Sequence, residues 1–344
     1  MSLKKLLSVF AILVVVSLVI TGCGTTKSPE PTAAPEGSSS ELIGAGHNVA
    51  VVFASSGLGD KSFNDSLYTG MVLAANNLGF AWDYVEPTSM AELEPYLRSY
   101  AQSGLYDVIV CNGFSCGSSL TTVATEFPDQ KFLINDAFVD LPNVASYTFN
   151  DTELGYLVGV VAGKMTKTNT IGFIAAHDIP LLNAGLVGFE AGAKSVNPDV
   201  KVIYDYVGSW DDIAKTKEIA LALHNQGADF FYHMASLGGL GMIEAGKEQG
   251  FYTVGYDGNQ NPLAPETNIL SAIRSFPSAV GLGIEGALKG EFSAGNHLLG
   301  LKENGVYITN ELSTVKIDPE ILKLVEDAKE GIINGSIKLP EVEE

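Results

Sequence analysis

Short apolar runs alternate with amphipathic segments along most of the chain. The apolar runs are rich in β-branched residues and predict strands at residues 48–54, 106–111, 131–135, 170–175, 201–206, 229–234, 252–256 and 269–273. Segments with helical spacing fall between them or after the last, at residues 65–78, 92–102, 118–126, 154–165, 184–196, 213–226, 240–249 and 318–333. This alternation predicts parallel sheets with helices on both faces, and therefore an α/β fold.

The strand-helix pattern restarts after Phe149, which suggests two similar lobes. The strand at residues 49–54 and the helix with Gly70 resemble the strand at 171–176 and the helical segment at 187–189. About 300 residues follow position 48, a length suited to two domains rather than one core. In doubly wound sheets ligands bind beyond the carboxyl ends of the strands. We therefore expect a cleft between the lobes, lined by the loops that follow the strands.

The N-terminal segment has the layout of a secretory signal. Lys4 and Lys5 precede an apolar run from Leu6 to Ile20, which two small residues separate from Cys23. The run is shorter than the ~20 residues that span a bilayer. This layout predicts a signal peptide at residues 1–22, with Cys23 as the lipidated first residue of the mature chain. Residues 23–47 are rich in Ser, Thr, Pro, Gly and Ala and are expected to form a flexible tether.

Charge and composition exclude several kinds of partner. The net charge is −20, so nucleic acid is not an expected partner, because its phosphates require a basic surface. The five histidines are scattered and show no metal-ligand spacing, so we expect neither a metal nor a cofactor. Cys111 and Cys116 could form a disulfide or remain small buried thiols.

Four positions after predicted strands carry side chains suited to a small ligand. The polar loop at residues 55–64 leads into a helix, whose first N–H groups favour acceptors. Trp210 follows the strand at 201–206 and could stack on a planar ligand or pack on its own helix. Asp257 follows another strand and could accept hydrogen bonds from sugar hydroxyls or form an Asx-turn. Arg274 ends a short strand and could bind a polar ligand or pair with surface carboxylates.

One motif favours a hydrolase instead. Residues 113–117 read Gly-Phe-Ser-Cys-Gly and fit the Gly-x-Ser-x-Gly nucleophile elbow between a strand and a helix. Asp257 and His297 follow Ser115 in the order of an α/β-hydrolase triad. The pattern also describes an ordinary glycine-rich turn, and no second motif supplies an oxyanion hole. An extracellular serine hydrolase is therefore an alternative from another class.

Several segments together resemble the basic membrane protein family of lipoproteins, which includes purine nucleoside receptors of ABC importers. They occur in the family's order between about residues 49 and 275, and cover most of the folded chain. The matching segments are residues 60–64, 127–132, 155–159, 188–193, 197–200, 208–211 and 255–257, with Gly70 and Phe149. Each segment alone is weak evidence, whereas the series is specific.

The resemblance implies a type I periplasmic-binding-protein fold: two doubly wound parallel-sheet lobes, joined by a hinge, that close on a ligand. The expected N-terminal lobe comprises residues 48–148 and about 261–298. The expected C-terminal lobe comprises residues 149–260 and about 299–344. The chain would thus return to the first lobe near Asn261.

The resemblance also implies a ligand site. By position, the two stacking aromatics fall on Tyr68 and Trp210, and the ribose carboxylate falls on Asp257. A backbone glycine falls within Gly238-Gly239, Arg274 stands where the family usually has lysine, and a further first-lobe contact is expected near Phe114 or Asp136. Nucleoside-binding members usually have Asp-Asp before Lys-Ser-Phe-Asn, but here the first position is Gly59, so Asp60 or Asn64 would contact the base.

These observations predict a lipid-anchored solute-binding protein on the extracytoplasmic face of the cell membrane. It would be a monomer that is not an enzyme, and would deliver a purine nucleoside to an ABC permease. A free purine or another planar metabolite such as a flavin is the alternative cargo. A ligand-sensing receptor without transport is a third alternative.

Overall fold

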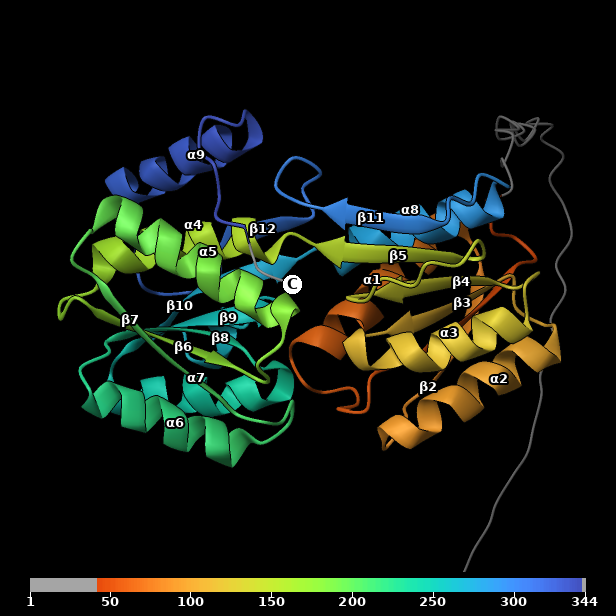
Figure 1. Ribbon diagram of the computed structural model, residues 1–344, viewed down its shortest axis with the longest axis horizontal. Coiled ribbons are helices and arrows are strands. Elements are labelled where there is room, and N and C mark those ends of the chain that lie inside the picture. The colour runs from red at the N-terminus through yellow and green to blue at the C-terminus, as the bar shows by residue number, and fades with distance from the viewer. Residues whose placement is uncertain (1–41, 342–344) are drawn as a thin grey trace, which may run out of the picture. The chain divides into compact units, whose positions relative to one another are not determined.

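The computed structural model describes residues 42–341 (Figure 1). The predicted signal peptide, the predicted lipidation site Cys23 and most of the predicted tether lie outside these residues. None of the helices in the described part is long and apolar enough to cross a membrane.

The first lobe contains a sheet of six parallel strands in the order β11-β5-β4-β3-β1-β2 (Figure 1). These strands are β1 (Asn48–Val52), β2 (Ala81–Val85), β3 (Val108–Asn112), β4 (Lys131–Asn135), β5 (Val144–Phe149) and β11 (Gly295–Leu299). The helices are α1 (Phe63–Leu78), α2 (Leu93–Ser103), α3 (Gly117–Glu126) and α8 (Phe276–Leu288). Successive β1 residues enter different apolar clusters, Val49 and Val51 one and Ala50 and Val52 the other, because strand side chains alternate between faces.

The second lobe contains a sheet in the order β12-β10-β9-β8-β6-β7. Its strands are β6 (Thr170–Ala175), β7 (Lys201–Tyr206), β8 (Phe230–Met234), β9 (Tyr252–Asp257), β10 (Asn268–Arg274) and β12 (Val306–Thr309). Only β12 runs antiparallel within this sheet. The helices are α4 (Asp151–Met165), α5 (Pro180–Val196), α6 (Ile213–Asn225), α7 (Gly239–Gln249) and α9 (Pro319–Ile333). The two parallel-sheet lobes confirm the predicted fold class.

The chain passes between the lobes at three places: between β5 and α4, between β10 and α8, and between β11 and β12. The predicted return near Asn261 is therefore wrong, because β10 pairs with β9 and β12 in the second sheet. The chain returns to the first lobe at Ser275 instead. Residues 261–274 thus belong to the second lobe, and Arg274 is the last residue of its strand.

Glycines allow α4 and α5 to pack closely. A Cβ atom on Gly159 would overlap the carbonyl oxygen of Phe189, and one on Gly192 would overlap the carbonyl oxygen of Tyr156. The backbones of the two helices therefore lie closer together than larger residues at these positions would allow. Helix α4 starts directly after the chain first passes between the lobes. Its packing against α5 therefore fixes the position of the helix next to the hinge.

Candidate functional site

A cleft lies between the loops at the carboxyl ends of the strands in both lobes. It contains about 540 Å³ of unfilled space, part of it open to solvent. The lining residues are Ala54, Ser55, Ser56, Phe63, Gly113, Phe114, Ser115 and Asp136 from the first lobe, and Leu181, Leu182, Trp210, Ser236, Tyr256, Asp257 and Arg274 from the second. Nearly all of them follow or end a strand, so the cleft lies where parallel α/β sheets bind ligands.

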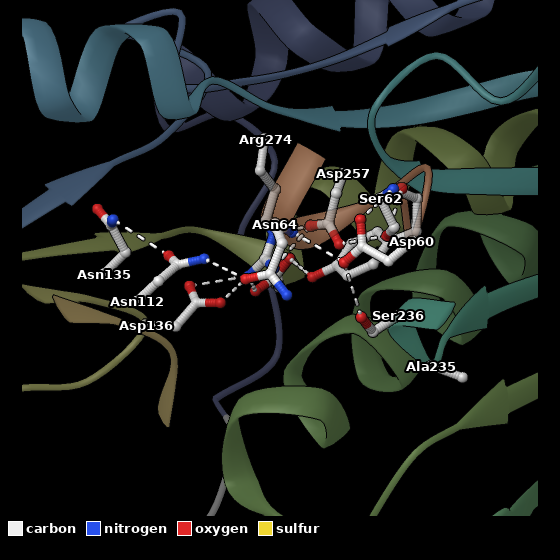
Figure 2. A network of polar contacts seen from close by, with 12 residues as sticks. Asp60, Ser62, Asn64, Asn112, Asn135, Asp136, Ala235, Ser236, Asp257 and Arg274 are labelled. Atoms are coloured by element: carbon white, nitrogen blue, oxygen red, sulfur yellow. Dashed lines mark hydrogen bonds and ion pairs between the residues drawn. The ribbon is translucent and has the colours of Figure 1, made fainter. Parts of the chain in front are cut away.

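Arg274 is the centre of a buried ionic network that joins the lobes (Figure 2). Its side chain is 3% exposed. The Nε atom donates to Asp257 Oδ1 at 2.7 Å, and Nη1 donates to Asp136 Oδ1 at 2.8 Å. Asp151 Oδ2 lies 3.6 Å from the same Nη1 atom. Because Asp136 belongs to the first lobe and Asp257 to the second, the guanidinium bridges the two.

Aromatic rings enclose this guanidinium. The Arg274 Cζ atom lies 4.6 Å from the centre of the Tyr256 ring and 5.3 Å from that of Phe149. Phe63 and Phe276 are at 5.5 and 5.4 Å. The rings attract the cation through their π-faces and exclude water from the ion pairs. The ion pairs are therefore stronger than similar pairs at the surface.

The carboxylates outnumber the cation that they surround. Burial raises the pKa of Asp136 to about 6, an effect that Arg274 opposes and Asp257 reinforces. Burial also raises the pKa of Asp151 to about 7, again against the attraction of Arg274. Asp151 is thus partly protonated near neutral pH and lies behind the lining, but one guanidinium does not fill the acceptor positions of Asp136 and Asp257, so this part of the cleft favours groups that donate hydrogen bonds.

Asp60 and Asn64 build the first loop, and Asp60 Oδ2 also accepts a 3.4 Å hydrogen bond from the hydroxyl of the cleft residue Ser236 in the second lobe. Asp60 is 1% exposed and accepts hydrogen bonds from the backbone N–H groups of Ser62, Asn64 and Asp65, at the start of α1. Burial raises its pKa to about 6. The Asn64 side chain accepts from Ala54 N–H and donates to the Gly57 carbonyl oxygen. Both residues therefore hold the loop that carries Ser55 and Ser56.

Ser62 makes a second contact between the lobes. Its hydroxyl donates to Asp257 Oδ2 at 2.7 Å and also lies 3.0 Å from the carbonyl oxygen of Tyr256 (Figure 2). Asp257 thus contacts Arg274 through one carboxylate oxygen and Ser62 through the other.

The structure brings five of the ten predicted ligand-binding residues into the lining of this cleft. Phe114, Asp136, Trp210, Asp257 and Arg274 all line it. Gly238 N–H donates to the carbonyl oxygen of Trp210 at 2.9 Å and so supports the loop that carries the indole. Gly239 follows as the first residue of α7.

Tyr68 and Gly59 lie apart from the cleft lining. The Tyr68 ring packs with Trp82 and Tyr84 at ring-centre distances of 5.4 and 6.0 Å, so the structure does not place it with Trp210. Gly59 has a left-handed φ of 95°, and its N–H donates to Asp65 Oδ1. An aspartate at this position would be strained, since only glycine adopts such angles without cost.

The sequence interpretation missed part of the lining: Phe63, Leu181, Leu182, Ser236 and Tyr256. Their apolar or small polar side chains give no signal of a site in the sequence. Three of the seven non-glycine residues with left-handed φ in the described part of the chain lie in the cleft lining. Asp136, Ser236 and Asp257 have left-handed φ values of 61°, 47° and 68°. Non-glycine residues rarely adopt such angles, and when they do they cluster at functional sites.

The hydrolase triad is not assembled. Ser115 lines the cleft, but His297 lies on β11, where its Nε2 atom contacts the carbonyl oxygen of Ser293 at 2.8 Å. The His297 ring stacks on Tyr147 and borders a different pocket of the first lobe. Asp257, the third predicted member, is bonded to Arg274 and Ser62.

Cys111 and Cys116 form a disulfide. Their Cα atoms lie 6.3 Å apart, and both side chains are fully buried. The bond joins the end of β3 to the turn that precedes α3, and resolves the two alternatives that the sequence left open.

Comparisons with known proteins agree with this architecture. Residues 47–343 match the model of the family described as ABC transporter substrate-binding protein PnrA-like. The ABC transporter nucleoside-binding protein BmpA of Lactococcus lactis is 31% identical over 98% of this chain and 99% of its own length. An uncharacterised lipoprotein of Pyrococcus furiosus is 32% identical, with 84% of each chain covered. The crystal structure of an ABC transporter solute-binding protein from Aeropyrum pernix superposes with a TM-score of 0.77 at 31% identity, over 86% of this chain and 94% of that one.

Proposed function

The chain belongs to the family of PnrA-like ABC transporter substrate-binding proteins, and we propose that it binds a purine nucleoside between its lobes and delivers it to an ABC permease. The observation that carries the proposal is the cleft in which Trp210 lies with the carboxylates of Asp136 and Asp257. A planar base can stack on the indole, and base N–H groups and ribose hydroxyls can donate to the carboxylates. The nucleoside-binding relative from Lactococcus lactis supports this cargo.

The excess of carboxylates suits a nucleoside better than an anionic ligand. Asp136 and Asp257 already accept hydrogen bonds from Arg274, yet a carboxylate has about four acceptor positions. The remaining positions can accept from hydroxyl and N–H groups, whereas a phosphate would be repelled. A nucleotide or a phosphorylated flavin therefore fits the cleft poorly.

The binding mechanism is closure of the two lobes over the ligand. Arg274 and Ser62 contact the opposite lobe through Asp136 and Asp257, so the closed form has its own stabilising contacts. A ligand that also contacts both lobes shifts the population further towards this form. The permease would recognise the closed form, and no covalent bond is made or broken.

The proposed location is the extracytoplasmic face of the cell membrane, with Cys23 carrying the lipid. Two observations support it. The relative from Pyrococcus furiosus is named a lipoprotein, and the disulfide between Cys111 and Cys116 is of a kind that persists in oxidising compartments.

Calorimetry of the chain from Cys23 onward tests the cargo. Adenosine, guanosine and inosine are expected to bind at least tenfold more tightly than adenine, guanine or riboflavin, because a bidentate ribose contact adds ~1.4 kcal/mol or more. Equal or tighter binding of a free base or of riboflavin would replace the nucleoside with that alternative cargo.

The two tryptophans of the chain provide a matched test of stacking. Trp210→Ala is expected to weaken nucleoside binding by about 5- to 150-fold, since stacking of a base on an aromatic ring contributes ~1–3 kcal/mol. Trp82→Ala is the control, because Trp82 packs with Tyr68 and Tyr84 away from the cleft lining. Unchanged affinity in Trp210→Ala would remove the stacking proposal.

A further inference from the structure

The hinge lies at one edge of each sheet, and the opposite edges are formed by β2 and β7. The chain passes between the lobes at the ends of β5, β10 and β11 and the start of β12, which all stand at or next to the same edge of their sheets. Strand β2 ends the first sheet on the other side, and β7 ends the second (Figure 1). When lobes rotate about a hinge, the parts farthest from it move furthest. The separation of β2 and β7 therefore depends strongly on closure.

The two edge strands carry the same short pattern. Strand β2 contains Trp82-Asp83-Tyr84, and β7 contains Tyr204-Asp205-Tyr206. The centres of the two rings are 5.6 Å apart in β2 and 5.8 Å apart in β7. In each strand the aspartate Oδ1 atom accepts a hydrogen bond from the N–H of the next tyrosine at 2.8 Å. Strand β2 follows α1 and β7 follows α5, and each pairs in parallel with the strand before that helix, so the feature is duplicated at equivalent places.

These edges expose their side chains but protect their backbone. Tyr84 is 39% exposed and Tyr204 is 53% exposed. The N–H groups of Tyr84 and Tyr206 are already bonded to the neighbouring aspartates. Charged side chains on an edge strand also oppose the addition of another strand. A partner would therefore meet the aromatic and carboxylate side chains rather than the main chain.

The chemistry of both edges fits a basic protein surface. Tyrosine and tryptophan are enriched where proteins bind one another, and their rings attract arginine and lysine through the π-face. Asp83 and Asp205 are exposed and add ionic attraction to such cations. Anionic lipid headgroups would be repelled by these carboxylates and by the net charge of −20. Complementary charge therefore favours a protein partner with basic side chains over a lipid surface.

The chain outside the described residues ends beside β2. Ala81, the first residue of β2, donates its N–H to the carbonyl oxygen of His47 at 3.0 Å, close to the start of the described part at Leu42. Cys23, the predicted lipidated residue, precedes Leu42 by about 20 residues, which span at most ~70 Å when extended. The β2 edge therefore lies within reach of the membrane that would hold a permease.

We propose that the exposed aromatic and aspartate side chains of β2 and β7 form the surface through which the closed protein docks on its permease. This proposal rests on the proposed function and names the surface that the partner contacts. Basic side chains of the permease bind one edge on each lobe. Because the edges belong to different lobes, the permease contacts both together only at the separation that closure gives them. Docking on both edges thus selects the closed form.

Binding of the chain from Cys23 onward to the permease complex encoded with it, held in lipid nanodiscs, tests the proposal. Tyr84→Ala and Tyr204→Ala are each expected to weaken binding about tenfold, because a few aromatic anchors dominate most interfaces. The double variant is expected to lose about 100-fold, since the two edges are distant and act independently. Tyr307→Ala is the matched control, because Tyr307 is 45% exposed on β12, the edge strand on the hinge side of the second sheet. Equal affinities of the three single variants would overturn the proposal.

Asp83→Asn tests the charge of the partner. The amide oxygen can still accept the hydrogen bond from the Tyr84 N–H, so the strand keeps its shape while the carboxylate is lost. This variant is expected to bind the permease about threefold more weakly at low ionic strength, and the difference is expected to shrink in high salt. Unchanged or tighter binding at low ionic strength would overturn the proposal of a basic partner.

Further measurements separate docking from the cargo and from other partners. Calorimetry with guanosine is expected to give Tyr84→Ala and Tyr204→Ala affinities within about twofold of the unaltered chain, because neither residue lines the cleft. An unaltered chain that binds the permease but no nucleoside would overturn the cargo and leave docking supported. An unaltered chain that does not bind the permease would overturn the docking proposal. So would a loss in Tyr84→Ala of binding to phosphatidylcholine–phosphatidylglycerol vesicles, which would assign the edge to lipid, or of a dimer in sedimentation, which would assign it to a second copy.

Discussion

The side chains around Arg274 bring three carboxylates and one guanidinium into a region that solvent scarcely reaches. For an acid whose folded pKa is raised, the folded protein holds a proton that the unfolded chain has released. The resulting stability is complete at low pH and is lost as the pH rises through the folded pKa. Asp151 contributes most to this loss of stability, because its pKa is raised from 3.8 to about 7.

We predict that the free energy of unfolding falls between about pH 4 and pH 7, the interval between the unfolded and folded pKa values of Asp151. Asp151→Asn is expected to reduce this fall by about 1–3 kcal/mol, since the amide carries no charge to bury. The amide oxygen of Asn can still accept the hydrogen bond from the Tyr256 hydroxyl. Part of the dependence is expected to remain, because burial raises the pKa of Asp60 and Asp136 in the same direction.

Urea unfolding at several pH values measures this effect. Asp327→Asn is the control, because Asp327 is exposed on α9 and pairs with Lys323 at the surface. A pH profile of Asp151→Asn that parallels that of the unaltered chain would contradict the assignment of the raised pKa to Asp151.

Among the secondary-structure elements, the α4–α5 pair depends on glycine for its close approach. A backbone carbonyl oxygen of the other helix occupies the space that a Cβ atom would need at Gly159, Gly188 and Gly192. Glycine in a helix interior costs ~1 kcal/mol relative to alanine, so the packing must more than offset this cost. The helices can separate only if many other contacts are lost.

Gly159→Ala is expected to destabilise the protein by about 1–3 kcal/mol, because the new methyl group overlaps the Phe189 carbonyl oxygen. Gly281→Ala, in the interior of α8, is the matched control. A Cβ atom at position 281 meets no heavy atom within 4 Å, so this substitution is expected to be neutral or to stabilise the fold by up to ~1 kcal/mol. Thermal unfolding of both variants measures the difference, and equal melting temperatures would contradict it.

For the molecule as a whole, the two lobes meet through a small number of buried polar contacts. Arg274 donates to Asp136 across the cleft, and Ser62 donates to Asp257. Buried ion pairs are costly to break from one side, because an uncompensated charge is left behind. Substitution of Arg274 should therefore change the equilibrium between the open and closed forms more than substitution of a surface arginine.

Arg274→Lys is expected to weaken interlobe contact by about 1–3 kcal/mol, because an ammonium cannot reproduce the forked guanidinium geometry. Small-angle scattering of the ligand-free variant is expected to show a larger radius of gyration, which nucleoside reduces. Arg98→Lys is the control, since Arg98 pairs with Glu94 and Glu126 at the surface of the first lobe. Identical scattering of Arg274→Lys and Arg98→Lys would exclude Arg274 as a link between the lobes.

The accuracy of the sequence interpretation varied with the kind of residue. Apolar runs such as 131–135 and 170–175 were placed correctly because a buried parallel strand is apolar on both faces. The edge strand β2 was missed, because its residues are mostly exposed and mixed in character. Helix α8 was missed as well, since it is rich in glycine and apolar residues and shows little helical patterning.

Local sequence determined the alternation of strands and helices and the signal-like pattern of residues 1–22 before Cys23. It also determined that Trp210, Asp257 and Arg274 stand at or after the ends of their strands. These features depend on neighbours within a few residues, which a linear pattern contains. Only the tertiary structure decided that Arg274 bridges Asp136 and Asp257, that β10 belongs to the second lobe, and that Phe114 rather than Tyr68 lines the cleft with Trp210. The physical reason is that strand pairing and lobe contact join residues far apart in the chain, and no local pattern specifies which of them meet.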